Sequence, residues 1–208
     1  MSIYRGASLL PLIEHNNELC IVLFGSSNNN IFMDIGGHSE ENETVFITAS
    51  RESTEESLNT FNIMPEQMEE KVTNYVLYKD YVCFLKKFNI SFDYIKQIYK
   101  YNKDIIYNSK YNIPHYWKET QNISLFSINS LLCGFTKNNY EYACHDIFGS
   151  LKIVFRRPIK YLKYAIEKNI IYKENHKWTT NLLSNNVFIN SNENNKLVFL
   201  NKTKSILI

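Results

Sequence analysis

Apolar residues along the chain are grouped in two ways, and each grouping predicts one kind of element. Short apolar runs between polar turns predict strands, and they span residues 8–13, 19–24, 31–35, 72–78, 81–88 and 123–128. Apolar residues that recur every three or four positions predict helices, and they span residues 44–58, 92–107 and 148–168. This mixture predicts an α/β domain over residues 1–135, followed by a basic helical extension over residues 136–208 that packs on it.

The composition is that of a folded protein. Of the 208 residues, 44% are hydrophobic and 21% are charged, which is enough for a core and argues against a disordered chain. Six glycines and four prolines exclude a collagen-like or linker-type sequence. No apolar run approaches the length of a membrane span, and the N-terminus lacks the pattern of a secretory signal. We therefore expect a cytoplasmic protein without a membrane partner.

The four cysteines predict neither disulfides nor a zinc site. They form no CxxC pair, and their spacing fits no zinc pattern. We expect free thiols in a reducing compartment.

Charge is distributed unevenly although the net charge is only +2. Residues 40–70 hold nine glutamates and one arginine, whereas residues 151–178 hold eight lysines or arginines and two glutamates. Arg156 and Arg157 lie in the basic stretch 152–177 and have side chains that suit phosphate groups. The stretch either contacts RNA or is a solvated helix face, and the pattern leaves both alternatives open.

Three carboxylates are placed for metal binding on the helix predicted at 44–58. Glu52, Glu55 and Glu56 are spaced i, i+3 and i+4, so they project from one helix face. Crowded like charges destabilise a solvated helix, but a divalent cation among them makes the arrangement favourable. The glycine pair Gly36-Gly37 precedes the helix and lets backbone approach closely, so that a carbonyl can add a further oxygen ligand.

This segment resembles the Nudix box, the sequence signature of the Nudix hydrolases. The residues at the required spacings are Gly37, Glu43, Arg51, Glu52, Glu55 and Glu56, and the resemblance covers about residues 5–135. Three positions depart from the signature: Ser53 and Asn59 replace apolar residues, and Leu58 replaces a glycine that ends the helix. We expect the helix to run one residue longer, with Asn59 adopting the left-handed conformation.

The resemblance implies a fold, a reaction and roles for particular residues. The fold is a Nudix-type α/β/α sandwich with a mixed sheet, and the reaction is hydrolysis of a diphosphate linkage in a nucleoside diphosphate derivative. By resemblance, four groups hold Mg²⁺ or Mn²⁺: the Gly36 carbonyl, Glu52, Glu55 and Glu56. Glu119 is a further candidate ligand. Arg51 and Glu43 orient the carboxylates, and the general base is Glu52 or Glu119. His38, Arg156 and Arg157 are candidates for substrate contacts.

Two other functions remain open at this point. One is an mRNA-decapping enzyme that acts on capped RNA and grips it through residues 152–177. The other is a non-catalytic, Nudix-like RNA-binding or regulatory protein, which the departures at Ser53 and Leu58 suggest. The intact carboxylate triad favours an enzyme. The sequence predicts neither the leaving group nor the oligomeric state.

Overall fold

The computed structural model of the chain describes residues 4–28, 30–69, 74–110, 112–182, 184–185, 198–200 and 205–207. Its helices are α1 (Val45–Glu56), α2 (Pro65–Glu69), α3 (Phe92–Asn108), α4 (Ile128–Leu132) and α5 (Arg156–Glu167), with the 3₁₀ helix η1 (His115–Lys118). Its strands are β1 (Gly6–His15), β2 (Glu18–Ser26), β3 (Ile31–Met33), β4 (Ile35–His38), β5 (Tyr75–Tyr78), β6 (Tyr81–Phe88), β7 (Thr120–Ser127), β8 (Phe135–Thr136), β9 (Glu141–His145), β10 (Leu151–Phe155), β11 (Ile171–Glu174), β12 (Lys177–Thr180), β13 (Ser184–Asn185), β14 (Val198–Leu200) and β15 (Ser205–Leu207).

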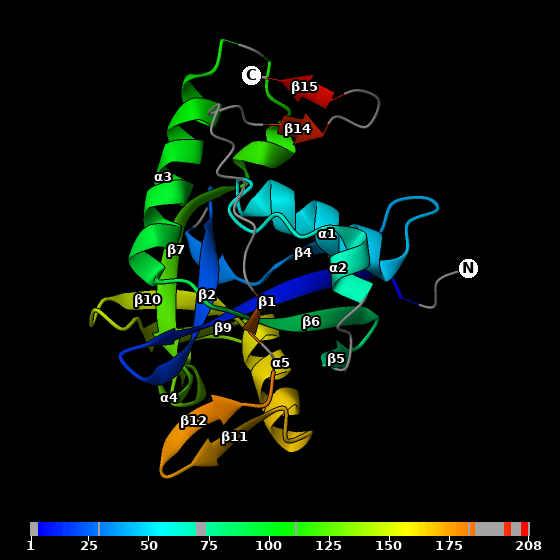
Figure 1. Cartoon of the computed structure of the whole chain (residues 1–208). Helices are drawn as coiled ribbons and strands as arrows, with labels where there is room; N and C mark the ends of the chain where they lie inside the picture. The colour runs from blue at the N-terminus through cyan, green and yellow to red at the C-terminus, as the bar shows by residue number, and fades with distance from the viewer. Residues whose placement is uncertain are drawn as a thin grey trace.

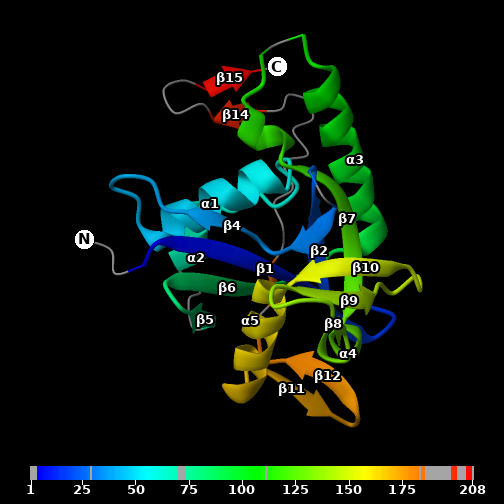
Figure 2. The same ribbon diagram turned by 180° about the vertical axis from the view of Figure 1, so that it is seen from behind.

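One mixed sheet of eleven strands organises the described part of the chain (Figures 1 and 2). Its main path runs β13-β6-β1-β2-β3-β10-β9-β8, while β4 pairs with β1, β5 with β6 and β7 with β2. The long central strands β1 and β2 form an antiparallel hairpin, whereas β1 and β6 pair in parallel. Two further hairpins, β11–β12 and β14–β15, lie outside this sheet.

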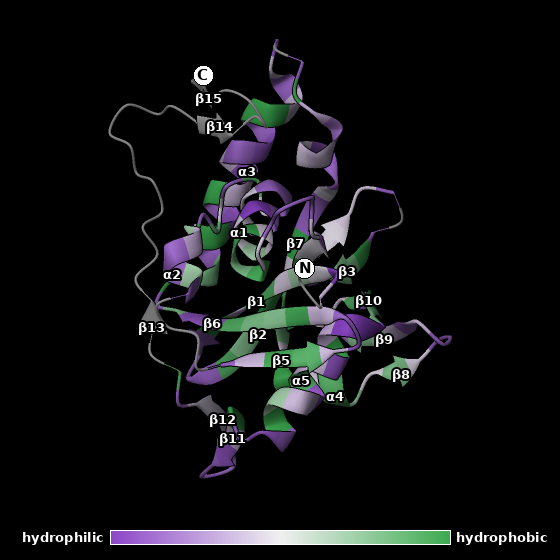
Figure 3. Ribbon diagram, turned by 90° about the vertical axis from the view of Figure 1, so that its right-hand side faces the viewer, coloured by the Kyte–Doolittle hydropathy of each residue, from purple (hydrophilic) through white to green (hydrophobic). Residues whose placement is uncertain are grey.

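Helices cover both faces of the sheet. Successive residues of a strand point to opposite faces, so Leu9 joins the hydrophobic cluster that includes Ala49 of α1 and Ile95 of α3. Its neighbour Leu10 joins the second cluster, which includes Leu162 of α5. Because both faces of β1 and β2 are buried, these strands are hydrophobic along nearly their whole length, as Figure 3 shows.

The structure confirms the predicted α/β fold with a mixed sheet between helices. Both predicted hairpins are present, as β1–β2 and β5–β6, although residues 72 and 73 of the predicted fourth run lie outside the described residues. The helices predicted at 44–58 and 92–107 are α1 and α3. All four cysteines are free, as expected. Among the described helices, none has the length and apolar character that crossing a membrane requires.

The helix predicted over residues 148–168 is wrong in its first half. Residues Leu151–Phe155 form the strand β10, and α5 begins only at Arg156. β10 pairs with β9 and, in parallel, with β3, so the C-terminal third contributes strands to the main sheet as well as a helix. A short apolar segment satisfies both the helical and the alternating pattern, and pairing with β9 and β3 decides between them. The division of the chain near residue 135 stays a prediction.

Candidate functional site

The helix α1 carries the predicted carboxylates and lies over β1 and β4. Its first turn is capped by Thr44, whose Oγ1 accepts a hydrogen bond from the Ile47 amide at 3.3 Å. The face against the sheet is made of small residues, including Ala49 and Ser53, both fully buried. The Ser53 hydroxyl donates to the Ser50 carbonyl at 2.9 Å, so the polar replacement at this box position is satisfied within the helix.

The end of α1 corrects the expectation that the helix runs one residue longer. The helix ends at Glu56, and Leu58 itself adopts the left-handed conformation with φ of 53°, followed by Asn59 with φ of 61°. The Asn59 amide donates to the Thr54 carbonyl at 2.6 Å, which closes the helix end. A non-glycine residue here costs about 1–2 kcal/mol. The Leu58 side chain is completely buried, and this burial offsets the strain.

Arg51 binds three glutamates at once. Its Nε and Nη2 donate to the two carboxylate oxygens of Glu43 at 2.8 and 3.0 Å. Its Nη1 donates to Glu52 at 2.7 Å and to Glu55 at 3.2 Å, and Nη2 also donates to the His38 carbonyl at 3.0 Å. Burial alone would raise the pKa of Glu43, but the hydrogen bonds and charge of Arg51 hold it below its usual value. Arg51 therefore uses Nε and Nη2 for Glu43 and Nη1 to orient Glu52 and Glu55.

The glycine pair of β4 lies against two of the helix carboxylates, Glu56 and Glu52. The Gly36 amide donates to Glu56 Oε2 at 2.6 Å. A Cβ atom at Gly37 would lie only 2.3 Å from Glu52 Oε1, so a larger residue there would displace the Glu52 carboxylate. Burial raises the pKa of all three helix carboxyls, well above the usual value for Glu56 and to about 7 for Glu55, and the charge of Glu52 raises both further. The negative charge of this cluster is thus poorly compensated.

These groups surround a cleft with a volume of about 270 Å³. Its lining residues are Gly36, Gly37, His38, Glu40, Arg51, Glu52, Glu55, Glu56, Tyr116 and Glu119. Glu119, which follows η1, is more than sixty residues away from α1 in the sequence, yet its charge acts on Glu52. Tyr116 is a lining residue that the sequence analysis missed, because an isolated tyrosine in an aromatic-rich segment carries no spacing signal.

The two arginines proposed for substrate contacts lie elsewhere, outside the lining of the cleft. The Arg157 Nε donates to Asp34 Oδ1 at 2.9 Å, and its Nη2 donates to the Gly36 carbonyl at 3.2 Å. Asp34 is also a residue that the sequence analysis missed. The Nη1 of Arg156 donates to the Asn139 carbonyl at 3.2 Å.

The donors around the cleft fit a hard divalent cation by their chemistry. They are carboxylate oxygens with the Gly36 carbonyl beside them, which are the oxygen ligands that hard cations prefer. Within the described residues, no three histidine, cysteine or acidic side chains are already gathered in a metal-binding arrangement. Instead, Glu52 and Glu55 hydrogen bond to Arg51, and Glu56 to the Gly36 amide.

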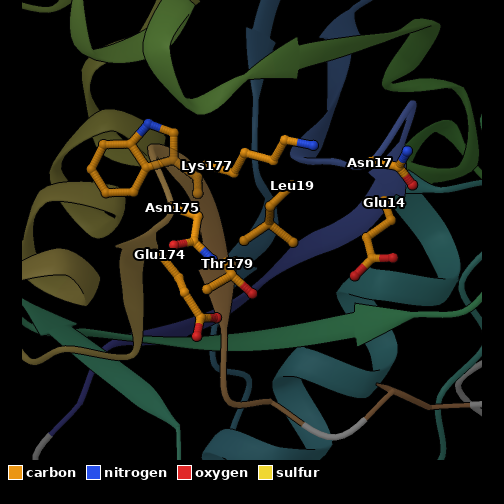
Figure 4. A pocket seen from close by; sticks show the side chains of 8 residues that line it. Glu14, Asn17, Leu19, Glu174, Asn175, Lys177 and Thr179 are labelled. Carbon is orange, nitrogen blue, oxygen red and sulfur yellow. The ribbon is translucent and has the colours of Figure 1, made fainter.

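A second hollow, of about 400 Å³, lies between the β1–β2 turn and the β11–β12 hairpin (Figure 4). It is lined by Glu14, Asn17, Leu19, Glu174, Asn175, Lys177, Trp178 and Thr179. None of the site residues predicted from the sequence is among these lining residues, and both charge signs are present without a cluster of one kind. This hollow therefore does not compete with the glutamate cleft as the candidate site.

No protein-family model matches the chain, and no curated protein matches it. Among solved structures, it is similar to an Ap4A hydrolase from C. elegans in a binary complex, with 19% identity, 60% of this chain and 81% of that chain covered, and a TM-score of 0.38. It is also similar to a MutT/nudix family protein from Enterococcus faecalis, with 12% identity, 78% of this chain and 61% of that chain covered, and a TM-score of 0.41. A mutT/nudix family protein from Listeria innocua is 15% identical, with 79% of this chain and 92% of that chain covered and a TM-score of 0.36.

Proposed function

We propose that the protein is a Nudix-type hydrolase that uses Mg²⁺ or Mn²⁺ to cleave a diphosphate linkage in a nucleoside diphosphate derivative. The observation that carries this proposal is the Arg51 network. Arg51 hydrogen bonds to Glu43, Glu52 and Glu55, and the last two line the cleft together with the glycine pair of β4. A binding-only protein has no need for so many crowded carboxylates.

Three carboxylates and one carbonyl are the groups that would hold the metal: Glu52, Glu55, Glu56 and the Gly36 carbonyl. When bound, the ion would neutralise phosphate oxygens and lower the pKa of water. The chain's own residues then have separate tasks. Arg51 fixes the directions of Glu52 and Glu55, and the Gly36 amide fixes that of Glu56.

Glu119 is our candidate for the group that accepts a proton from the attacking water. It lines the cleft from the segment after η1, so it does not share the helix of the three proposed ligands. Glu52 remains the alternative base, but its Oε1 is engaged by Arg51 at 2.7 Å. His38 lines the cleft beside the glycines and is our candidate for a contact with a phosphate group.

We favour a small nucleotide derivative over capped RNA as the substrate. The RNA alternative requires free cations in the basic stretch 152–177. Two of them already have internal partners: Arg157 binds Asp34, and Lys152 lies 3.9 Å from the buried Asp146 carboxylate. The cytoplasmic location and the RNA contact stay predictions from the sequence.

The test is a hydrolysis panel with purified protein. The substrates are diadenosine tetraphosphate, ADP-ribose and capped RNA, each with Mg²⁺, Mn²⁺ or EDTA. We expect metal-dependent release of phosphorylated products from at least one small nucleotide, and no turnover by the Glu52→Gln/Glu56→Gln variant. Equal turnover by that variant and the wild type would refute the site. Turnover confined to capped RNA would replace the small-nucleotide proposal with decapping.

A further inference from the structure

The backbone of Gly36 is hydrogen bonded to side chains from two helices. Its amide donates to Glu56 at 2.6 Å, and its carbonyl accepts from Arg157 at 3.2 Å. β1 is the only strand that pairs with β4 in the described part of the chain. The hydrogen-bonding groups of Gly36 are thus used by α1 and α5, which lie on opposite sides of β1 (Figure 1).

Arg157 is itself held rigidly in the structure. Only 16% of its side chain is exposed, and its partner Asp34 is completely buried. The guanidinium carbon lies 5.1 Å from the centre of the Tyr81 ring, so the group is stacked as well as hydrogen bonded. A planar guanidinium can reach Asp34 and the Gly36 carbonyl together, which the single ammonium of a lysine does less well. Arg157 is not itself among the residues that line the cleft.

We propose that Arg157 is a positioning residue for the carboxylate cluster. Through Asp34 and the Gly36 carbonyl, it fixes the β3–β4 connection. This keeps the Gly36 amide on Glu56 and keeps Gly37 against Glu52. The inference rests on the proposed function and extends it, because it makes the C-terminal segment a working part of the candidate active site.

The first test does not depend on metal or substrate. The chain has six glycines, so glycine-selective ¹⁵N labelling gives a simple spectrum in which Gly36 and Gly25 are followed individually. We expect Arg157→Met to speed hydrogen exchange of the Gly36 amide at least tenfold more than that of Gly25 in β2. Arg157→Lys should give a smaller difference. Equal acceleration at the two glycines would overturn the proposal.

A matched control separates positioning from general destabilisation. Leu162 is fully buried on the same helix, and Leu162→Ala weakens the packing of α5 without touching Asp34 or Gly36. This variant should speed exchange of both glycines by the same factor. If it reproduces the selective effect at Gly36, Arg157 acts only through helix packing and the proposal is wrong. If Arg157→Met does not fold, Arg157→Lys carries the same comparison.

The second test links the position of Gly36 to the proposed site. Mn²⁺ binding, measured by electron paramagnetic resonance, should weaken at least tenfold in Arg157→Met and less than twofold in Leu162→Ala. On diadenosine tetraphosphate, kcat should fall while KM changes less than threefold, because Arg157 does not line the cleft. Unchanged Mn²⁺ affinity in Arg157→Met would overturn the link. If the wild type neither binds Mn²⁺ nor hydrolyses any substrate, the proposed function fails, and the exchange result still decides whether Arg157 positions Gly36.

Discussion

Removing the charge of Glu55 should make the metal-free protein less sensitive to pH. The Glu55 side chain is 11% exposed, and one of its oxygens lies 3.2 Å from Arg51 Nη1. Burial raises its pKa from 4.5 to about 7; the Arg51 charge opposes this shift, and the Glu52 charge adds to it. Glu55→Gln keeps the shape of the side chain but cannot ionise.

The sign of the effect follows from proton binding. Below about pH 4.5 the carboxyl is protonated in both the folded and the unfolded chain, so its contribution to stability is fully present. As the pH rises toward 7, the unfolded chain releases the proton while the folded protein keeps it. Stability therefore falls with rising pH, and the loss is complete above the folded-state pKa.

The size of the effect follows from the same shift. A rise from 4.5 to about 7 corresponds to about 3 kcal/mol at most. The side chain borders the cleft, where water screens its charge, so we expect about 1–3 kcal/mol. The quantity to compare is the difference in unfolding free energy, Glu55→Gln minus wild type. This difference should increase by that amount as the pH rises from 5 to 8.

The assay is urea unfolding in EDTA across that pH range, with Glu43→Gln as the matched control. The pKa of Glu43 is lowered, so this carboxyl is ionised in both states above pH 5. Its substitution should therefore shift stability by a constant amount. A constant difference for Glu55→Gln as well would show that Glu55 does not hold a proton in the folded protein, and the reasoning would be refuted.

Three further predictions concern the cleft and the end of α1. Glu56→Gln should keep the fold and lower kcat by at least about a hundredfold at saturating Mg²⁺, and turnover near the wild-type level would contradict its role. Gly37→Ala should reduce Mn²⁺ affinity and turnover because the new Cβ would lie 2.3 Å from Glu52 Oε1, as calorimetry and kinetics can check. Leu58→Gly relieves about 1–2 kcal/mol of strain but removes a buried side chain whose loss costs about 2–5 kcal/mol. It should therefore lower the unfolding free energy, and a more stable variant in urea would disprove this balance.

Local patterns were sufficient to predict the central elements. β1, β2 and β6 are short apolar runs, and α1 and α3 follow helical spacing, because each buries a face defined by its own residues. The motif resemblance likewise implied that Arg51 and Glu43 act together on the carboxylates, and the two side chains are hydrogen bonded within one short segment. Such features depend on residues that are close in the sequence.

Features that depend on distant residues could not be predicted. The Arg157–Asp34 pair joins residues 123 positions apart, and no spacing rule connects them. The strand β10 was predicted as helix because its pairing with β9 and β3, and not its own residue pattern, selects the extended form. At Leu58, the conformational preference predicted a different turn, but burial of the side chain outweighed the backbone cost.

The parallel pairing of β10 with β3 has a consequence for synthesis of the protein. Ile153 of β10 pairs with Ile31 of β3, so the ribosome adds about 120 residues after β3 before this partner strand exists. At roughly 5–20 residues per second, this interval lasts on the order of 6–24 s. During that time the growing chain presents the β3 edge to solvent, and an open edge is a template for pairing with other chains. Ribosome-bound chains that stop before residue 151 should therefore recruit chaperones more strongly than chains that extend beyond α5.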